Sequence, residues 1–228
     1  MPMVVFNERL KDNANMPSID EIRKKTMHDG LSRDALHENP FVSFADWYNQ
    51  AINCGIPEPT AMCLATVDHE GQPWQRMVLL KIFDESGFVF FTNYSSRKAE
   101  HINSNHKVSL LFPWHAIGRQ IKITGHADKI STTESLRYFL TRPRGSQIGA
   151  WASPQSKVIT SRSMLDAKAQ EMKQKFANGD IPLPDFWGGY RVTASTIEFW
   201  QARDDRLHDR FIYHLTDEGQ WVIDRLAP

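Results

Sequence analysis

Two cations follow a pair of serines at the point where an apolar segment gives way to a predicted helix. Ser95 and Ser96 can cap a helix that begins near Arg97, which places Arg97 and Lys98 in its first turn. The positive end of a helix dipole disfavours cations there. A bound anion reverses that sign, because free N–H groups, hydroxyls and two cations together suit a phosphate. The pattern therefore indicates either a phosphate site or a solvated helix start.

A second group of residues also suits an oxyanion. Tyr138 and Arg142 are four residues apart and share one face of a predicted helix that Pro143 stops. Ser146 follows in a segment that can return towards Arg142. A phenol, a guanidinium and a hydroxyl at one helix end suit a phosphate monoester. The alternative is a tyrosine stacked on an exposed arginine.

The segment FWQARDDRLHDRF near the C-terminus carries alternating cations. Arg206, His208 and Arg210 line one face if the segment is extended. Such groups repel each other unless an anionic or electron-rich ligand lies against them. The alternative is a solvated, salt-bridged edge strand. Trp200, a few residues earlier, offers a flat surface for an aromatic ring.

Arg76 and Lys81 bracket the apolar run RMVLLK. In a regular strand their opposite parity places them on opposite faces, unless a bulge intervenes or they serve different parts of one ligand. A cation that faces the interior is costly to leave unpaired. The alternative is that each ends its strand in water. Gln155 and Ser156 form a polar pair in a loop, which by itself indicates no more than a turn.

Strands and inserted helices must position these residues. Residues 75–83 and 88–92 are apolar runs joined by turn residues, which predicts a β-hairpin. Further strands are predicted at 61–68, 108–112, 120–130, 190–201, 211–215 and 221–224. Helices are predicted at 19–28, 40–54, 161–176 and from a capping box at Ser131. Some six to eight mostly antiparallel strands with peripheral helices indicate an antiparallel barrel. The sequence contains no G-x-G-x-x-G, P-loop or G-x-S-x-G motif.

Composition narrows the class of protein. The chain has 228 residues, with 27 Lys and Arg balanced by 27 Asp and Glu, which argues against a general nucleic-acid or membrane-surface binder. Cys54 and Cys63 are the two cysteines, either free thiols or one bridge, and they form no disulfide framework or zinc motif, so a reducing compartment is expected. Residues 1–17 are predicted to form a loose tail without a secretory signal. With no run of membrane-spanning length, we expect a cytoplasmic protein.

Several blocks in order resemble the pyridoxine (pyridoxamine) 5′-phosphate oxidase family. They are RMVLLK, FFTNYSSRKA, SLLFPW, RPRGSQIGAW, PDFWGGYRV, IEFWQ, RLHDRF and DRLAP, and the resemblance runs over residues 40–228. It implies a mainly β split-barrel fold of antiparallel strands with peripheral helices, one FMN as cofactor, and a homodimer with both active sites at the interface. We accordingly expect an N-terminal extension at 1–39, partly flexible, and an FMN-binding oxidase domain at 40–228.

The resemblance also implies roles for individual residues. The family's FMN contacts fall on Arg76, Met77, Val78, Leu79, Leu80, Lys81, Phe91, Thr92, Arg97, Lys98, Gln120, Gln155, Ser156, Trp200 and Arg210. Its substrate-phosphate contacts fall on Lys81, Tyr138, Arg142 and Ser146, and its catalytic contacts to the pyridine ring fall on Arg206 and His208. No metal is implied. An interface site also eases the parity conflict between Arg76 and Lys81, because the two need not face the pocket of the same subunit.

Two positions depart from the family pattern. An arginine-rich N-terminal segment often ends in a tyrosine that closes over the substrate, and here it reads Arg23-Lys24-Lys25-Thr26. With Thr26 in place of the aromatic residue, we assign this segment no lid role. Phe91 stands where a tyrosine is common, which is harmless if the contact is made by the backbone.

The implied reaction is the oxidation of pyridoxamine 5′-phosphate or pyridoxine 5′-phosphate to pyridoxal 5′-phosphate, with O2 as electron acceptor and H2O2 as product. One alternative is a non-catalytic split-barrel protein that binds FMN or pyridoxal phosphate. A third hypothesis, RNA binding through basic and aromatic residues, is disfavoured by the zero net charge. The expected partners are therefore the two B6 vitamers, O2 and a second copy of the chain, with no nucleic acid and no membrane.

Overall fold

The computed structural model describes residues 4–5 and 18–228. Apart from Val4–Val5, the predicted tail of residues 1–17 lies outside the described residues. The division into an extension and an oxidase domain stays a prediction. Within the extension, however, Leu31 and Leu36 belong to the main hydrophobic core.

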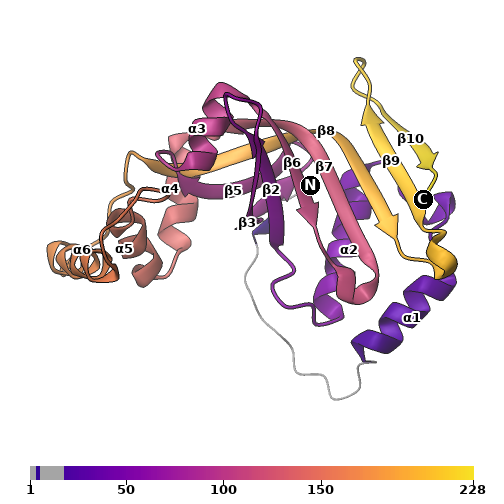
Figure 1. The fold of residues 1–228 in the computed structure, drawn as a ribbon, viewed down its shortest axis with the longest axis horizontal. Coiled ribbons are helices and arrows are strands. Elements are labelled where there is room, and N and C mark those ends of the chain that lie inside the picture. The colour runs from indigo at the N-terminus through magenta and orange to yellow at the C-terminus, as the bar shows by residue number, and fades with distance from the viewer. Residues whose placement is uncertain (1–3, 6–17) are drawn as a thin grey trace.

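One antiparallel sheet of ten strands dominates the described chain, in the order β1-β4-β5-β8-β7-β6-β2-β3, with β9 beside β8 and β10 beside β9 (Figure 1). The strands are β1 (Val4–Val5), β2 (Ala61–Val67), β3 (Pro73–Leu79), β4 (Ile82–Asp84), β5 (Gly87–Asn93), β6 (Lys107–Phe112), β7 (Arg119–Lys129), β8 (Trp187–Gln201), β9 (Asp209–Leu215) and β10 (Trp221–Leu226). The predicted antiparallel barrel is confirmed, and the predicted number of strands is too low. The strand predicted at 75–83 is two strands, β3 and β4, and β1 was not predicted.

The predicted strand at 75–83 is interrupted. β3 ends at Leu79 and pairs with β2, whereas β4 begins at Ile82 and pairs with β5, so the β4–β5 hairpin is confirmed. Between them, the Leu80 amide donates to Thr60 O at 2.9 Å and the Lys81 amide donates to Val89 O at 2.9 Å. β3 and β4 are consecutive in the chain but lie near opposite ends of the strand order. The sheet therefore curls into a barrel whose two ends meet at Leu80 and Lys81.

The long strand β8 joins the two halves of the sheet. Its first part pairs with β5, its last part pairs with β9, and β7 runs along both. The β7–β8 register shifts between Thr124 and Gly125. A Cβ at Gly125 would lie 2.0 Å from Thr193 O, so the backbones approach too closely there for any side chain.

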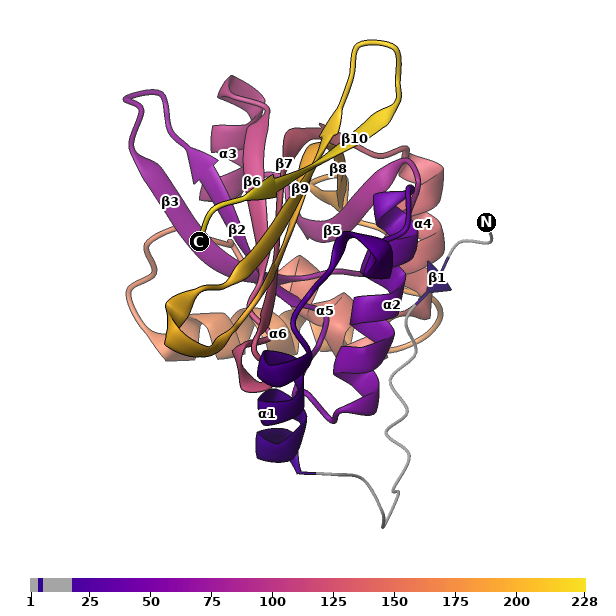
Figure 2. The same ribbon diagram turned by 90° about the vertical axis from the view of Figure 1, so that its right-hand side faces the viewer.

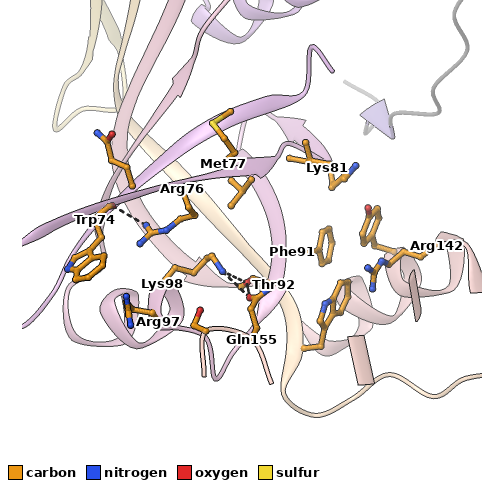
Figure 3. A pocket seen from close by; sticks show the side chains of 16 residues that line it. Trp74, Arg76, Met77, Lys81, Phe91, Thr92, Arg97, Lys98, Arg142 and Gln155 are labelled. Carbon is orange, nitrogen blue, oxygen red and sulfur yellow. Dashed lines mark hydrogen bonds between the residues drawn. The ribbon is translucent and has the colours of Figure 1, made fainter. Parts of the chain in front are cut away.

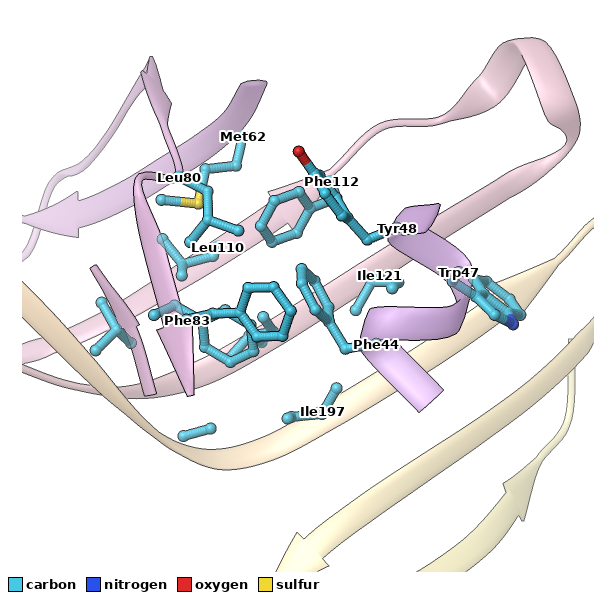
Figure 4. Packing of buried hydrophobic residues seen from close by; sticks show 14 of the residues in the cluster. Phe44, Trp47, Tyr48, Met62, Leu80, Phe83, Leu110, Phe112, Ile121 and Ile197 are labelled. Carbon is cyan, nitrogen blue, oxygen red and sulfur yellow. The ribbon is translucent and has the colours of Figure 1, made fainter. Parts of the chain in front are cut away.

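The helix α2 (Pro40–Asn53) supplies the aromatic centre of the barrel. Asn39 caps it with a hydrogen bond from the Phe41 amide, and Pro40 starts its first turn. Phe44 is fully buried, and its ring centroid lies 4.9 Å from Phe83, 4.9 Å from Phe88 and 5.1 Å from Phe112 (Figure 4). This edge-to-face cluster fixes the curvature of the strands around the helix.

The remaining helices are α1 (Ile19–Asp29), α3 (Arg97–Ser104), α4 (Thr132–Thr141), α5 (Arg144–Ala152) and α6 (Arg162–Lys175), with 3-10 turns at Arg33–Ala35, His115–Ile117 and Asp204–Arg206. The helices α4 to α6 lie together at one end of the sheet (Figure 1), around a second core cluster that includes Phe139 and Trp187. At the other end, α1 lies beside the start of β9 (Figure 2). Gln201, the last residue of β8, donates from Nε2 to Thr26 O of α1 at 2.8 Å.

Sequence reasoning predicted the capping box of α4 correctly and missed α5. Ser131 accepts from the Glu134 amide, and the Glu134 side chain accepts from the Ser131 amide. Pro143 does stop α4, but the segment expected to loop back from it forms a helix instead. Its glycine-containing sequence, RGSQIGAWA, gave little helical signal.

Candidate functional site

A cavity of about 650 Å3 opens between β3, β5, α3, α4 and the start of β8 (Figure 3). The predicted site residues that line it are Arg76, Met77, Val78, Leu79, Lys81, Phe91, Thr92, Arg97, Lys98, Tyr138, Arg142, Gln155 and Ser156. Three further lining residues, Trp74, Gln75 and Trp187, were not predicted. Trp74 could have been found, because it alternates with Arg76 along β3.

Arg76 and Lys81 line the same cavity of one chain. The parity expectation is wrong here because it assumed one continuous strand. The interruption at Leu80 and Lys81 resets the alternation, so no second subunit is needed to bring the two cations together. Leu80 itself points the other way and is fully buried in the core.

The cationic end of the cavity is built by Arg76, Arg97 and Lys98. Lys98 Nζ donates to Thr92 Oγ1 at 3.0 Å, to Ser96 Oγ at 3.3 Å and to Gln155 Oε1 at 2.9 Å. Burial, with Arg76 nearby, lowers the pKa of Lys98 to about 8. Each partner is neutral, so this buried ammonium has no counter-charge in the contacts of the described chain.

Ser96 occupies the N-cap position of α3, but its side chain makes no capping hydrogen bond. The expected capping by this hydroxyl is therefore wrong, because its oxygen accepts from Lys98 Nζ instead. On the outer side, the Arg97 guanidinium lies 4.6 Å from the Trp74 ring centroid, and Trp74 Nε1 donates to Asp68 Oδ2 at 2.9 Å. The tryptophan thus holds Arg97 at the rim of the cavity.

The opposite end of the cavity is aromatic and carries one guanidinium. The ring centroids of Phe91 and Tyr138 are 3.9 Å apart, and those of Phe91 and Trp187 are 5.3 Å apart. Arg142 lies over Trp187 at 4.6 Å, and its buried Nη1 has no hydrogen-bond partner among the described residues. Burial lowers the pKa of Arg142 and raises that of Tyr138. A buried, unsatisfied guanidinium nitrogen is costly, and an anionic oxygen would satisfy it.

Ser146 lies in the first turn of α5, exposed, and outside the cavity lining. Ser146 was expected to reach back towards Arg142, and the neighbouring Gln147 makes that contact instead. Its Nε2 donates to Phe139 O at 3.1 Å and to Arg142 O at 3.0 Å, which ties α5 to the end of α4. Gln147 therefore fixes the backbone that carries Arg142.

Five predicted site residues form a second group, away from this cavity. Gln120, Trp200 and Arg210 are register neighbours on β7, β8 and β9, and the His208 ring centroid lies 4.6 Å from that of Trp200. The fifth, Arg206, is exposed in the 3-10 turn Asp204–Arg206.

The prediction that Arg206, His208 and Arg210 line one face of an extended segment is wrong. Asp205 and Arg206 have positive φ values of 53° and 61°, so the backbone turns before β9 begins. Arg210 is also not left to repel the others, because it donates to Glu198 Oε1 at 2.9 Å. The Arg203 amide donates to His208 Nδ1 at 3.2 Å, which fixes the orientation of that ring.

The length of β8 separates the two groups within one chain. Trp187 lines the cavity, and Trp200 stands thirteen residues further along the same strand. At a rise of about 3.3 Å per residue, that is roughly 40 Å along the strand. Within one chain, none of the five residues of the second group lines the cavity.

Other kinds of site are not found in the described residues. No three His, Cys, Asp or Glu side chains in this part of the chain gather closely enough to hold a metal ion. None of the described helices combines the length and the apolar character that crossing a membrane requires.

The curled antiparallel sheet and its cavity define a split β-barrel protein. Residues 48–176 match the family model described as pyridoxamine 5′-phosphate oxidase, and residues 187–228 match the pyridoxine 5′-phosphate oxidase C-terminal dimerisation region. The chain belongs to the pyridoxamine 5′-phosphate oxidase family.

Individual relatives agree with this assignment. The chain is 56% identical over 213 residues to the pyridoxine/pyridoxamine 5′-phosphate oxidase of Shewanella putrefaciens, covering 93% of this chain and 100% of that protein. It is 54% identical over 210 residues to the enzyme of the same name from Proteus mirabilis, covering 92% and 96%.

Solved structures share the fold. PhzG from Burkholderia lata, in complex with tetrahydrophenazine-1-carboxylic acid, has a TM-score of 0.82 at 29% identity, covering 88% of this chain and 98% of that one. A pyridoxamine 5′-phosphate oxidase-related, FMN-binding protein from Nostoc punctiforme has a TM-score of 0.67 at 16% identity, covering 83% and 97%.

The depressed pKa of Lys98 predicts how anion affinity depends on pH. Below about 8 the side chain is charged, and above that value it is neutral. The affinity for a phosphate-bearing ligand should therefore fall as the pH rises from 7.5 to 9.0. Since a bound phosphate raises the lysine pKa, we expect a loss of up to about tenfold, the size of one charge-assisted hydrogen bond.

Fluorescence titration with FMN measures this dependence. Lys98→Arg is the matched control, because a guanidinium stays charged over this range and should give a flat profile. Parallel profiles for the two proteins would show that the charge of Lys98 does not cause the pH dependence of the affinity.

Proposed function

We propose that this protein oxidises pyridoxamine 5′-phosphate or pyridoxine 5′-phosphate to pyridoxal 5′-phosphate, with FMN as cofactor and O2 as the electron acceptor. The observation that carries the proposal is one cavity with basic side chains at two separate ends. Arg76, Arg97 and Lys98 form one end, and Arg142 lies at the other, beside the stacked rings of Phe91, Tyr138 and Trp187 (Figure 3). Two phosphorylated ligands with flat rings fit such a cavity better than one. Membership of the oxidase family supports the same substrates.

The residues at the cationic end fit the phosphate of FMN. Three basic side chains converge there, and the buried Lys98 has only neutral partners within the described chain. Gln155 and Ser156 border the same end, and the positive φ of Ser156, 68°, turns the backbone at this point. When bound, FMN supplies a two-electron acceptor that takes a hydride from the substrate and is reoxidised by O2, which yields H2O2.

The aromatic end fits the phosphate of the B6 vitamer. The unpartnered Nη1 of Arg142 would donate to a phosphate oxygen, and Tyr138 and Lys81 line the same cavity. A phosphate held there is remote from the reacting carbon, so its binding energy orients the substrate and does not act on the bond that breaks. Stacking on Phe91 and Trp187 fixes Tyr138 and Arg142 before any ligand arrives.

The second group of residues reaches the cavity only in a homodimer, which we include in the proposal. Trp200, Arg206, His208 and Arg210 all lie within the matched C-terminal dimerisation region. We infer that a second copy places them beside the cavity, where Arg206 and His208 hold the pyridine ring. Because His208 Nδ1 accepts a hydrogen bond from the Arg203 amide, the neutral ring carries its proton on Nε2 and can donate it.

A cytoplasmic location belongs to the same proposal. It is supported by Cys54 and Cys63, which are both free thiols, as expected in a reducing compartment.

Flavin spectroscopy tests the oxidase directly. The purified protein, reconstituted with FMN, should show a flavin absorption spectrum that bleaches when pyridoxamine 5′-phosphate is added without oxygen. Admitting air should restore the colour and produce one H2O2 per pyridoxal phosphate. A protein that binds FMN but does not bleach would instead be the non-catalytic split-barrel alternative. A protein that cannot be reconstituted with FMN would contradict both.

Arg206→Ala tests the ring-holding role. We expect kcat/KM to fall by about two orders of magnitude or more, a loss of at least about 2.7 kcal/mol of transition-state stabilisation. The Kd for FMN should stay within about threefold, because Arg206 is assigned to the substrate and not to the cofactor phosphate. Arg203→Ala, which removes a neighbouring guanidinium, is the control for the loss of kcat/KM in Arg206→Ala. Turnover within a factor of about three of the unmodified enzyme would show that the role of Arg206 is wrong.

A further inference from the structure

Behind the cationic end of the cavity lies a buried polar pair, Thr66 on β2 and His101 on α3. Thr66 is fully buried and His101 is 7% exposed. Thr66 Oγ1 and His101 Nδ1 lie 3.0 Å apart. Neither residue lines the cavity itself, so neither can touch a ligand there without another residue in between.

Thr66 contacts Arg76, which does line the cavity. Arg76 Nη1 donates to Thr66 Oγ1 at 2.7 Å, and also to the backbone oxygens of Leu64 at 3.0 Å and Trp74 at 3.1 Å. Two of these three acceptors are backbone carbonyls, which any sequence on β2 and β3 would supply. Thr66 is the acceptor that depends on the identity of a side chain.

The protons of this contact can be assigned. Arg76 can only donate, and the Thr66 hydroxyl has one proton and two lone pairs, so its own proton needs another acceptor. His101 Nδ1 is that acceptor when the neutral ring carries its proton on Nε2. Burial, and next the charge of Arg76, lower the pKa of His101, while Asp68 opposes them. The hydrogen bonds therefore run from Arg76 to Thr66 to His101, and each one strengthens the next.

We propose that Thr66 and His101 are positioning residues for the cofactor phosphate. They hold Nη1 of Arg76 at β2 and so fix the position of a side chain that lines the cavity (Figure 3). The inference rests on the proposed FMN site, and it adds two residues that act on the phosphate through Arg76. Without His101, the Thr66 proton loses its acceptor, and the hydroxyl becomes a weaker and less well oriented acceptor for Arg76.

A double-mutant cycle on cofactor affinity tests this inference. The Kd for FMN is measured by quenching of flavin fluorescence in His101→Leu, Thr66→Val and His101→Asn, each in the native chain and in an Arg76→Ala chain. The asparagine carries an amide oxygen close to the position of Nδ1. We expect His101→Leu and Thr66→Val to raise the Kd about tenfold, which corresponds to about 1.4 kcal/mol. His101→Asn should stay within about threefold, and in the Arg76→Ala chain none of the three should change the Kd by more than about twofold.

The outcomes separate the positioning role from the function on which it rests. Equal losses in both chains would mean that Thr66 and His101 only support the fold, and would overturn the inference. An unchanged Kd for FMN in both His101→Leu and Thr66→Val would also overturn the inference. If Arg76→Ala itself leaves the Kd unchanged, the placement of the FMN phosphate at this end fails instead. Should His101→Leu not fold, as judged by thermal unfolding, Thr66→Val carries the same cycle with little change in side-chain shape.

Discussion

Positive charge held out of water is the constraint on which the rest of this structure depends. Lys98 is buried against neutral oxygens, and Arg142 keeps one buried nitrogen without a partner in the described chain. Removing a cation from water without an opposite charge is unfavourable, so the fold must hold both side chains in place by other means. Stacked rings and hydrogen bonds from several elements do so. An anionic ligand would then bind to groups that are already oriented and partly desolvated.

The barrel makes this arrangement possible by bringing the two ends of one sheet together. β3 and β4 follow each other in the chain and lie near opposite ends of the strand order. The crossing at Leu80 and Lys81 buries the leucine in the core and leaves the lysine at the cavity. The aromatic centre around Phe44 packs against Phe83 on β4 and Phe112 on β6. The core and the cavity are thus opposite faces of the same strands.

Local patterns were enough to predict much of this arrangement. Helix positions alone were enough to identify two groups as candidates, the cations Arg97 and Lys98 and the pair Tyr138 and Arg142. The members of each group lie within one turn of a helix. The ligands and the dimer came from the family resemblance and not from spacing. The course of most strands and helices followed from periodicity and from the Ser131 capping box.

What sequence reasoning missed depends on contacts between distant segments. The break at Leu80 is set by hydrogen bonds to Thr60 and Val89, not by a glycine or proline. The turn at Asp205 and Arg206 uses positive φ at two residues other than glycine, so the expected extended face does not form. The contact between Thr66 and His101 joins residues from separate elements. The only local indication of it was a polar residue, Thr66, at an inward-facing position of a strand.

The central claim is that one site needs the cavity of one chain and the Trp200–Arg210 segment of another. The most direct measurement is the activity of a mixed dimer, isolated with two different tags, in which one chain carries Arg142→Ala and the other carries Arg206→Ala. If each site combines both chains, one of its two sites is free of both substitutions, and turnover should return to about half that of the unmodified dimer. A mixed dimer of Arg97→Ala and Arg142→Ala, both in the cavity, should recover nothing. If the Arg142→Ala and Arg206→Ala pair is no more active than its two parent variants, the two groups do not form a shared site and the account is wrong.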